Sequence, residues 1–215
     1  CLIFSLVMVP AGRMQDRIGP RVVATIGGVL VGAGFLLASV TTSPLGYILG
    51  FGVLAGTGIG FGYAAATPPA VKWFPPAKTG LIAGIVVSGF GLASVYAAPL
   101  TKTLIDTWNI QTAVMVLGIA FLAIVTILAQ FLKAPPAGYL PAGTPAPKAA
   151  AVGDRKTDFA PREMLGTPQF YLLWFMYACG AGAGLMVIGK LAIIAKVQAG
   201  IDLGFLLVAV LAIGN

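Results

Sequence analysis

The sequence predicts an all-α integral membrane protein with several spanning helices, and three observations lead to this fold class. Hydrophobic residues fill 59% of the 215 positions, and the mean hydropathy is +0.98. Charged residues make up only 9% of the chain and gather between long apolar runs. A soluble domain cannot bury that much apolar surface, whereas runs of about 20 apolar residues with few charges are typical of membrane-spanning helices.

The apolar runs follow one another along the chain with polar connections between them. Residues 1–12 are the end of one helix, a last run follows Asp202, and the spans between them are expected at 22–41, 46–72, 80–101, 111–132 and 169–189. The 46–72 span is dense in glycine, which favours close packing against neighbouring helices. Because the chain begins and ends inside apolar runs and lacks an initiator Met, we expect a fragment of a longer protein.

The segment 133–168 differs in composition from everything around it. It holds seven prolines and several alanines and shows no periodic apolar pattern. Such a composition is typical of an extended linker. The sequence therefore predicts two membrane regions, 1–132 and 169–215, joined by a linker at 133–168.

The basic residues indicate how the chain is oriented in the membrane. Ten of the 13 lysines and arginines fall in the segments 13–21, 72–79 and 133–168, which must lie on the same side if successive connections alternate. Loops rich in lysine and arginine face the cytoplasm, so we expect these three to be cytoplasmic and the protein to be a multi-pass protein of the cytoplasmic membrane. The net charge of +7 does not indicate nucleic acid, because the charges end apolar runs and form no basic face interleaved with aromatics.

The residue inventory also argues against an enzyme. The chain has no histidine, and its two cysteines, Cys1 and Cys179, lie far apart in apolar stretches without metal-ligand spacing. No Asp or Glu falls in the middle of a predicted span. We therefore expect no catalytic constellation, no metal and no cofactor.

One charged stretch, "GRMQDRIGPR", connects the first two apolar runs. One interpretation is that its arginines serve only to keep this connection on the cytoplasmic side of the membrane. Its pattern, Gly-x-x-x-Asp-Arg-x-Gly-x-Arg, also resembles the cytoplasmic signature between the second and third helices of the major facilitator superfamily. The resemblance implies that glycine lets two helices approach and that the charged groups form a network at the cytoplasmic gate. It assigns Gly12, Asp16, Arg17 and Arg21 to that gate.

The same resemblance implies the architecture. Carriers of this superfamily are helical bundles with two six-helix halves built from inverted repeats. On this count the chain runs from the end of helix 2 into helix 8 of an expected 12. Residues 1–132 then belong to the N-terminal half, without helix 1 and the start of helix 2, and 169–215 begin the C-terminal half. The resemblance also implies a monomer.

Four longer strings narrow the family. They are "GFGYAAATPPAVKWFPPAKTGLIAGIVVSGFGL", "KAPPAGYLP", "TPQFYLLWFM" and "GLMVIG". Together they resemble the oxalate/formate antiporter family, which also includes transporters of lactate-like monocarboxylates. The resemblance implies secondary active transport, by alternating access, of a small organic anion such as lactate, formate or oxalate.

The family resemblance also implies three substrate-binding residues. Tyr63 ends "GFGY", where the family has a binding tyrosine, and Phe90 stands in "GFGL", where the family often has a tyrosine. Asn215 matches an asparagine that precedes the family's anion-binding arginine by four residues, so that arginine falls beyond residue 215. A carboxylate within the membrane needs such partners, because an unpaired buried charge is very costly. The simpler interpretation is that Tyr63 and Phe90 only pack and that Asn215 only satisfies a polar neighbour.

Several alternatives stay open at this point. A carrier of drugs or sugars and a non-transporting sensor on the same scaffold also fit the helix pattern. Without an acidic residue inside a span, the sequence does not choose between a proton and a counter-anion as the second transported species. It does not identify the carboxylate either.

Overall fold

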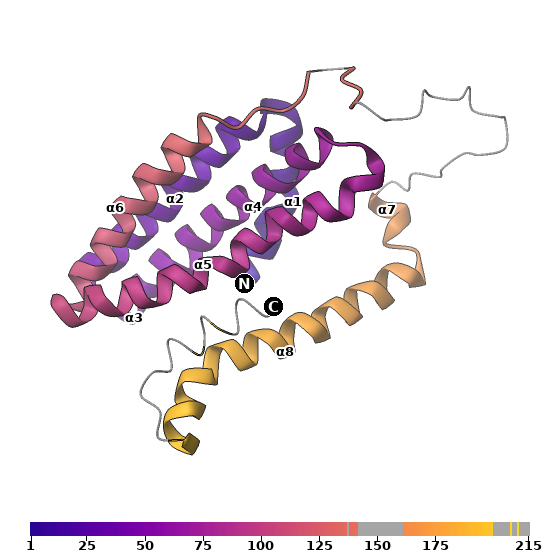
Figure 1. Cartoon of the computed structure of the whole chain (residues 1–215). Helices are drawn as coiled ribbons and strands as arrows, with labels where there is room; N and C mark the ends of the chain where they lie inside the picture. The colour runs from indigo at the N-terminus through magenta and orange to yellow at the C-terminus, as the bar shows by residue number, and fades with distance from the viewer. Residues whose placement is uncertain (137, 142–160, 200–206, 208–209, 211–215) are drawn as a thin grey trace, which may run out of the picture. The chain divides into compact units, whose positions relative to one another are not determined.

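The structure, a computed structural model, describes residues 1–136, 138–141, 161–199, 207 and 210 (Figure 1). Every regular element in these ranges is helical, which confirms the predicted fold class. The elements are α1 (Leu2–Ile18), α2 (Pro20–Val40), α3 (Pro44–Tyr47), η1 (Ile48–Ala55), α4 (Gly56–Lys72), η2 (Pro76–Lys78), α5 (Thr79–Thr107), α6 (Ile110–Ala129), α7 (Pro161–Met164) and α8 (Pro168–Ala199).

Five helical stretches among the described residues are long and apolar enough to cross a membrane. They are Pro20–Val40, Pro44–Lys72, Pro76–Thr107, Ile110–Ala129 and Pro168–Val187. Helices suit this setting because each satisfies its own backbone hydrogen bonds without water. The chain divides into two compact units, Cys1–Ala93 with Pro99–Thr144 and Ser94–Ala98 with Pro145–Asn215, and each is described by itself.

Several helices extend beyond the apolar runs that predicted them. Helix α5 continues to Thr107 rather than 101, and α8 continues to Ala199 rather than 189. The prediction of a loop at 13–21 is wrong for most of its residues, because α1 stays helical to Ile18. Hydropathy marks only the part of a helix that suits lipid, while the backbone hydrogen bonds can continue into water.

Short capping motifs fix where the helices of the first unit begin. Ser43 accepts a hydrogen bond through its Oγ from the backbone N–H of Gly46 at 3.1 Å, ahead of Pro44 in the first turn of α3. Asn109 Oδ1 accepts one from the N–H of Thr112 at 2.7 Å and begins α6. Both side chains satisfy a backbone donor that has no partner within its own helix.

Glycine pairs bring α2 close to the span formed by α3, η1 and α4. A Cβ placed on Gly58 would lie 2.5 Å from the carbonyl oxygen of Gly27, and one on Gly34 would lie 2.5 Å from that of Gly50. These backbones therefore touch directly, as small residues allow in membrane helices. The close packing expected for this glycine-rich span is confirmed.

The opposite side of α2 packs on α6 through glycine notches. Leu122 fills the space at Gly32, where an added Cβ would lie 2.6 Å from the leucine Cβ. Phe35 fills the notch at Gly118 in the same way, at 2.8 Å. Helix α2 is thus the centre of the first unit, with α4 and η1 on one side and α6 on the other, as Figure 1 shows.

The span from Pro44 to Lys72 contains an irregular centre. The eight residues of η1 have π-helical geometry, between the single turn of α3 and the regular helix α4. Helix α4 continues through Pro68 and Pro69 to Lys72. Prolines remove backbone donors from a helix, and membrane helices tolerate them where local geometry or neighbours compensate.

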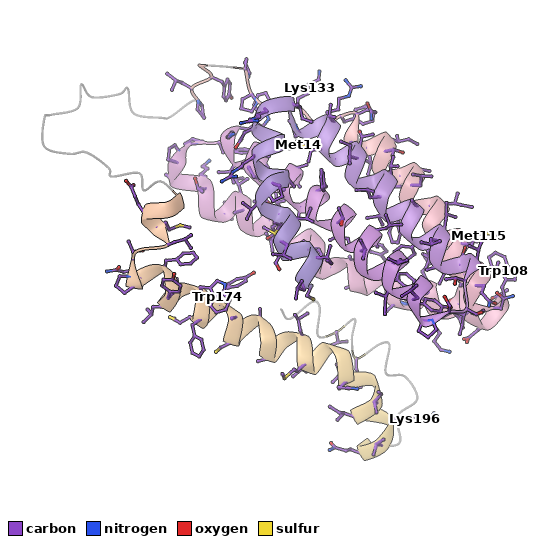
Figure 2. All side chains as sticks on the ribbon, turned by 180° about the vertical axis from the view of Figure 1, so that it is seen from behind. Met14, Trp108, Met115, Lys133, Trp174 and Lys196 are labelled. Carbon is purple, nitrogen blue, oxygen red and sulfur yellow. The ribbon has the colours of Figure 1, made fainter. Side chains whose placement is uncertain are left out.

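The second unit contains α7 and α8. The four-residue helix α7 lies within the segment 133–168, for which the sequence predicted an extended linker. Helix α8 has 32 residues, a length of about 48 Å at roughly 1.5 Å per residue. Figure 2 shows Trp174 near its start and Lys196 near its end. Lys190, one residue past the predicted span 169–189, therefore lies inside the helix.

Candidate functional site

The structure brings together two of the three residues predicted to bind substrate. The rings of Tyr63 on α4 and Phe90 on α5 lie with centroids 6.5 Å apart and planes at 89°. A third ring, Phe4 on α1, meets Tyr63 at 5.8 Å and 80°. Three helices thus supply one aromatic group, in the edge-to-face arrangement that aromatic pairs prefer. Here it is called the Tyr63 cluster, defined as Phe4, Tyr63 and Phe90.

The sequence of α4 explains why Phe4 reaches Tyr63. Gly56, Gly60 and Tyr63 are spaced i, i+4 and i+7, which places them on one face of the helix. A Cβ on Gly60 would lie 3.1 Å from the carbonyl oxygen of Phe4, and one on Gly56 would lie 3.6 Å from the Cβ of Ile3. The two glycines therefore let the backbone of α1 lie against α4 one to two turns before Tyr63.

The members of the Tyr63 cluster differ in exposure. Phe4 and Tyr63 are half-buried, whereas the Phe90 side chain is 66% exposed. Phe4 was missed in the sequence because an isolated phenylalanine in an apolar run looks like ordinary packing. The spacing of glycines before Tyr63 was a signal for a close helix neighbour, but it does not say which helix that is.

Asn215, the third predicted binding residue, lies outside the described residues. The Tyr63 cluster is therefore the part of the predicted site that the structure describes. A tyrosine hydroxyl can both donate and accept a hydrogen bond, and the two phenylalanines add apolar surface next to it. Such a group can hydrogen-bond one oxygen of a small anion through the Tyr63 hydroxyl, with two apolar rings beside it.

The predicted gate residue Asp16 has a specific partner. Its Oδ1 lies 3.1 Å from Nζ of Lys72, which joins the end of α1 to the end of α4. Both side chains are more than half exposed, at 62% and 53%. An exposed ion pair contributes only about 0–1 kcal/mol, so it forms and breaks easily. Lys72 was not predicted at the gate, although the sequence placed both residues on one side of the membrane.

Arg21 connects different helices from those joined by Asp16. Its Nε donates to Oε1 of Gln130 at 2.7 Å, and Nε2 of Gln130 donates to Oγ1 of Thr25 at 3.1 Å. This small network ties the start of α2 to the end of α6. Arg17 is exposed at the last turn of α1.

The glycines of the charged stretch have different roles. A Cβ on Gly12 would meet nothing within 4 Å in the described residues, so the close helix approach predicted there is not seen at this position. Gly19 was not assigned to the gate, yet its φ of +87° and ψ of 161° fall in a region that is essentially restricted to glycine. Gly19 makes the sharp turn that lets Pro20 begin α2 directly after α1. The Gly-Pro pair was the sequence signal for this turn.

The start of the segment 133–168 is attached to the same end of the first unit. The indole Nε1 of Trp73 donates to the carbonyl oxygen of Lys133 at 3.0 Å, and its ring meets Tyr139 at 5.1 Å. Figure 2 shows Met14 and Lys133 at one end of this unit, with Trp108 and Met115 at the other. The segments 13–21, 72–79 and 133–168, predicted to lie on one side of the membrane, are therefore in contact. Lys72 joins the second to the first through Asp16, and Trp73 joins it to the third through Lys133.

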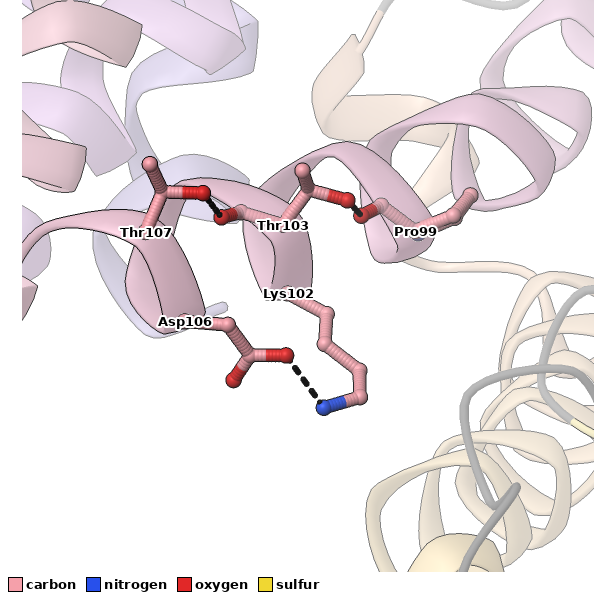
Figure 3. Close-up of polar contacts among 5 residues, drawn as sticks. All are labelled: Pro99, Lys102, Thr103, Asp106 and Thr107. Atoms are coloured by element: carbon pink, nitrogen blue, oxygen red, sulfur yellow. Dashed lines mark hydrogen bonds and ion pairs between the residues drawn. The ribbon is translucent and has the colours of Figure 1, made fainter.

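The far end of α5 holds a separate ion pair (Figure 3). Nζ of Lys102 lies 2.6 Å from Oδ2 of Asp106, one turn further along the same helix. Thr103 and Thr107 donate through Oγ1 to the carbonyl oxygens of Pro99 and Thr103, at 2.9 and 2.7 Å. The polar side chains of this helix end thus find their partners within the same helix, with both charges about half exposed.

The described residues thus form a helical bundle with apolar spans, with charged residues at the end of α1 and a tyrosine within α4, as in a polytopic membrane protein. The chain belongs to the Major Facilitator Superfamily, whose family model matches residues 1–215. Members of this family are transporters.

Curated relatives confirm the narrower resemblance. The chain is 32% identical to the oxalate:formate antiporter of Oxalobacter formigenes over 180 residues, which is 83% of this chain and 40% of the relative. It is 29% identical to the uncharacterized MFS-type transporter YhjX of Escherichia coli (strain K12), covering 89% of this chain and 46% of the relative. Human monocarboxylate transporter 11 is 33% identical over 51% of this chain and 23% of the relative. The chain spans less than half the length of each of these proteins.

Proposed function

We propose that this chain is part of a secondary active transporter that moves a small organic anion across the cytoplasmic membrane by alternating access. The substrate is a monocarboxylate such as lactate or formate, or oxalate. The carrier is a monomer and does no chemistry on its cargo. The segments 1–132 and 169–215 belong to its two halves, and 133–168 joins them on the cytoplasmic side.

The Tyr63 cluster carries this proposal. Its tyrosine lies on a helix whose sequence resembles the antiporter family, in a chain 32% identical to an oxalate:formate antiporter. The hydroxyl supplies a hydrogen bond to a carboxylate, and Phe4 and Phe90 contact the ring edge-to-face from two other helices. Asn215 and an arginine four residues later are proposed to complete the charge compensation, because a bidentate guanidinium matches a carboxylate.

The exposed Asp16–Lys72 pair supports the alternating-access part of the proposal. A contact biases a carrier only if it is made in one conformation and lost in another. An ion pair of this exposure costs little to break. We propose that Gly12, Asp16, Arg17 and Arg21 form the cytoplasmic gate, with Lys72 as the partner of Asp16.

The proposal is tested with the full-length protein reconstituted in liposomes. Vesicles are loaded with lactate, formate, oxalate or no anion, and uptake of labelled lactate or oxalate is followed with and without a pH gradient. Protein-free vesicles and vesicles loaded with a neutral sugar are the controls. We expect saturable uptake of at least one small carboxylate. Uptake into empty vesicles that follows the pH gradient indicates proton coupling, and uptake that needs internal anion indicates exchange.

A second panel of labelled sugars and cationic drugs addresses the alternative substrates. Uptake of one of these, with none of any small carboxylate, would contradict the proposed substrate class and leave the family membership intact. No uptake of any solute would favour a non-transporting sensor on the same scaffold.

A further inference from the structure

We infer that Phe4 is a positioning residue that fixes the orientation of the Tyr63 ring and thereby sets the affinity of the carrier for small carboxylates. This inference rests on the proposed function of Tyr63. Phe4 lies on α1, and no sequence pattern or comparison assigns it a role. The argument comes from the geometry of three rings and one glycine.

The Tyr63 ring has perpendicular neighbours on two different helices. Its plane makes an angle of 80° with Phe4 and of 89° with Phe90, with centroids 5.8 and 6.5 Å away. The position of a tyrosine hydroxyl depends on the two torsions that orient its ring. Neighbours on α1 and α5 restrict those torsions, and the closer of the two contacts is the one from Phe4.

The backbone supports the Phe4 contact independently of the rings. Gly60, one turn before Tyr63 on α4, is buried, and a Cβ there would lie 3.1 Å from the carbonyl oxygen of Phe4. Ordinary contact begins near 3.4 Å, so α1 lies closer to α4 here than a side chain at position 60 would allow without a shift. The Phe4 backbone is therefore held against α4 at the level that places its ring on Tyr63.

The same half of the protein contains a second aromatic cluster whose central ring is a phenylalanine. Phe35 on α2 meets Phe51 at 5.0 Å and 85°, and Phe121 at 5.4 Å and 70°. These rings share the edge-to-face geometry of the Tyr63 cluster, and Tyr47 joins them by stacking on Phe51 at 6.0 Å. Phe35→Leu is therefore the control for the packing loss that any phenylalanine substitution in this bundle causes.

The test measures KM and Vmax for the best carboxylate in proteoliposomes of the full-length protein. The variants are Phe4→Leu, Phe4→Tyr and Phe35→Leu, each made alone and together with Tyr63→Phe. Losing one aromatic pair corresponds to about a two- to tenfold change in an equilibrium. We expect Phe4→Leu to raise KM by about this factor, with Vmax per folded carrier retained. Phe4→Tyr keeps a ring at this position and is expected to keep the wild-type KM.

The decisive comparison is the Tyr63→Phe background. If Phe4 acts by placing the Tyr63 hydroxyl, Phe4→Leu has no further effect on KM once that hydroxyl is gone, because contacting residues are not additive. Gly60→Ala provides a second route, since its methyl displaces the Phe4 backbone. It is expected to raise KM in the wild-type background alone.

Two results would overturn the inference while the proposed function stands. One is an equal rise in KM from Phe4→Leu in both backgrounds, and the other is an equal rise from Phe35→Leu. If Phe4→Leu does not fold, Gly60→Ala decides the question by the same comparison of the two backgrounds. Absence of saturable carboxylate uptake by the wild type would instead overturn the proposed function, and the inference with it.

Discussion

The contact between α2 and α4 makes a sharp prediction about two glycines in the same helix. Replacing Gly58 with alanine places a methyl group 2.5 Å from the carbonyl oxygen of Gly27 and 2.7 Å from the backbone nitrogen of Val31. Neither atom can rotate away, since both belong to the backbone of α2. Replacing Gly62 with alanine places a methyl group where nothing lies within 4 Å.

The magnitude follows from the shortfall in distance. At Gly58 the methyl is 0.9 Å short of ordinary contact at 3.4 Å, so the two helices must separate or bend. Overpacking of this kind typically costs about 1–3 kcal/mol. Alanine is preferred over glycine in a helix by about 1 kcal/mol, and that gain applies to both variants. The free energy of unfolding of Gly58→Ala is therefore expected to be about 1–3 kcal/mol below that of Gly62→Ala.

The assay is reversible unfolding of the full-length protein in mixed detergent micelles, followed by circular dichroism at matched protein and lipid concentrations. We expect Gly62→Ala to be at or above wild type in stability, and Gly58→Ala to be at or below wild type and below Gly62→Ala. A Gly58→Ala protein as stable as Gly62→Ala would refute the reasoning, because it would show that the backbones of α2 and α4 do not touch at this level.

Three further predictions concern the charged end of the first unit. Gly19→Ala is expected to lower the free energy of unfolding by about 1–3 kcal/mol, since a φ of +87° with extended ψ strains any side chain; unchanged stability would contradict that turn. Asp16→Asn removes the ion pair with Lys72 and is expected to change the free energy of unfolding by less than about 1 kcal/mol and to make it less dependent on salt concentration. The double variant Asp16→Lys with Lys72→Asp exchanges the two charges and is expected to show the wild-type dependence on salt. Trp73→Phe removes one hydrogen bond to Lys133 and is expected to cost about 0.5–1.5 kcal/mol and to speed protease cleavage after Lys133; cleavage at the wild-type rate would contradict the attachment.

The helix cores were predictable because the membrane imposes a simple requirement on sequence. Helix α2 begins at Pro20 and ends at Val40, close to the expected 22–41, since the apolar run and the helix nearly coincide there. The extensions of α5 and α8 were not predictable from hydropathy. Their additional turns carry three lysines and one aspartate, Lys102, Asp106, Lys190 and Lys196, and these charges favour contact with water but do not end a helix.

The contacts of the candidate site were less predictable than the helices. Tyr63 was found through its local string, but Phe4 has no local signal, because its role depends on where α1 crosses α4. The Asp16–Lys72 pair joins residues 56 positions apart, which a local motif cannot specify. The open space at Gly12 shows the same limit, since a motif names a glycine without showing what it faces.

The central claim is that the Tyr63 hydroxyl binds the carboxylate of a transported anion, and one substitution tests it most directly. Exchange of labelled lactate or oxalate is measured in proteoliposomes for Tyr63→Phe and for the control Tyr47→Phe, whose ring instead stacks on Phe51 at 6.0 Å. A hydrogen bond to a charged group is worth about 1.5–3 kcal/mol, so Tyr63→Phe is expected to raise KM roughly ten- to hundredfold. Tyr47→Phe is expected to leave KM unchanged. Equal KM values for wild type and Tyr63→Phe would contradict the account.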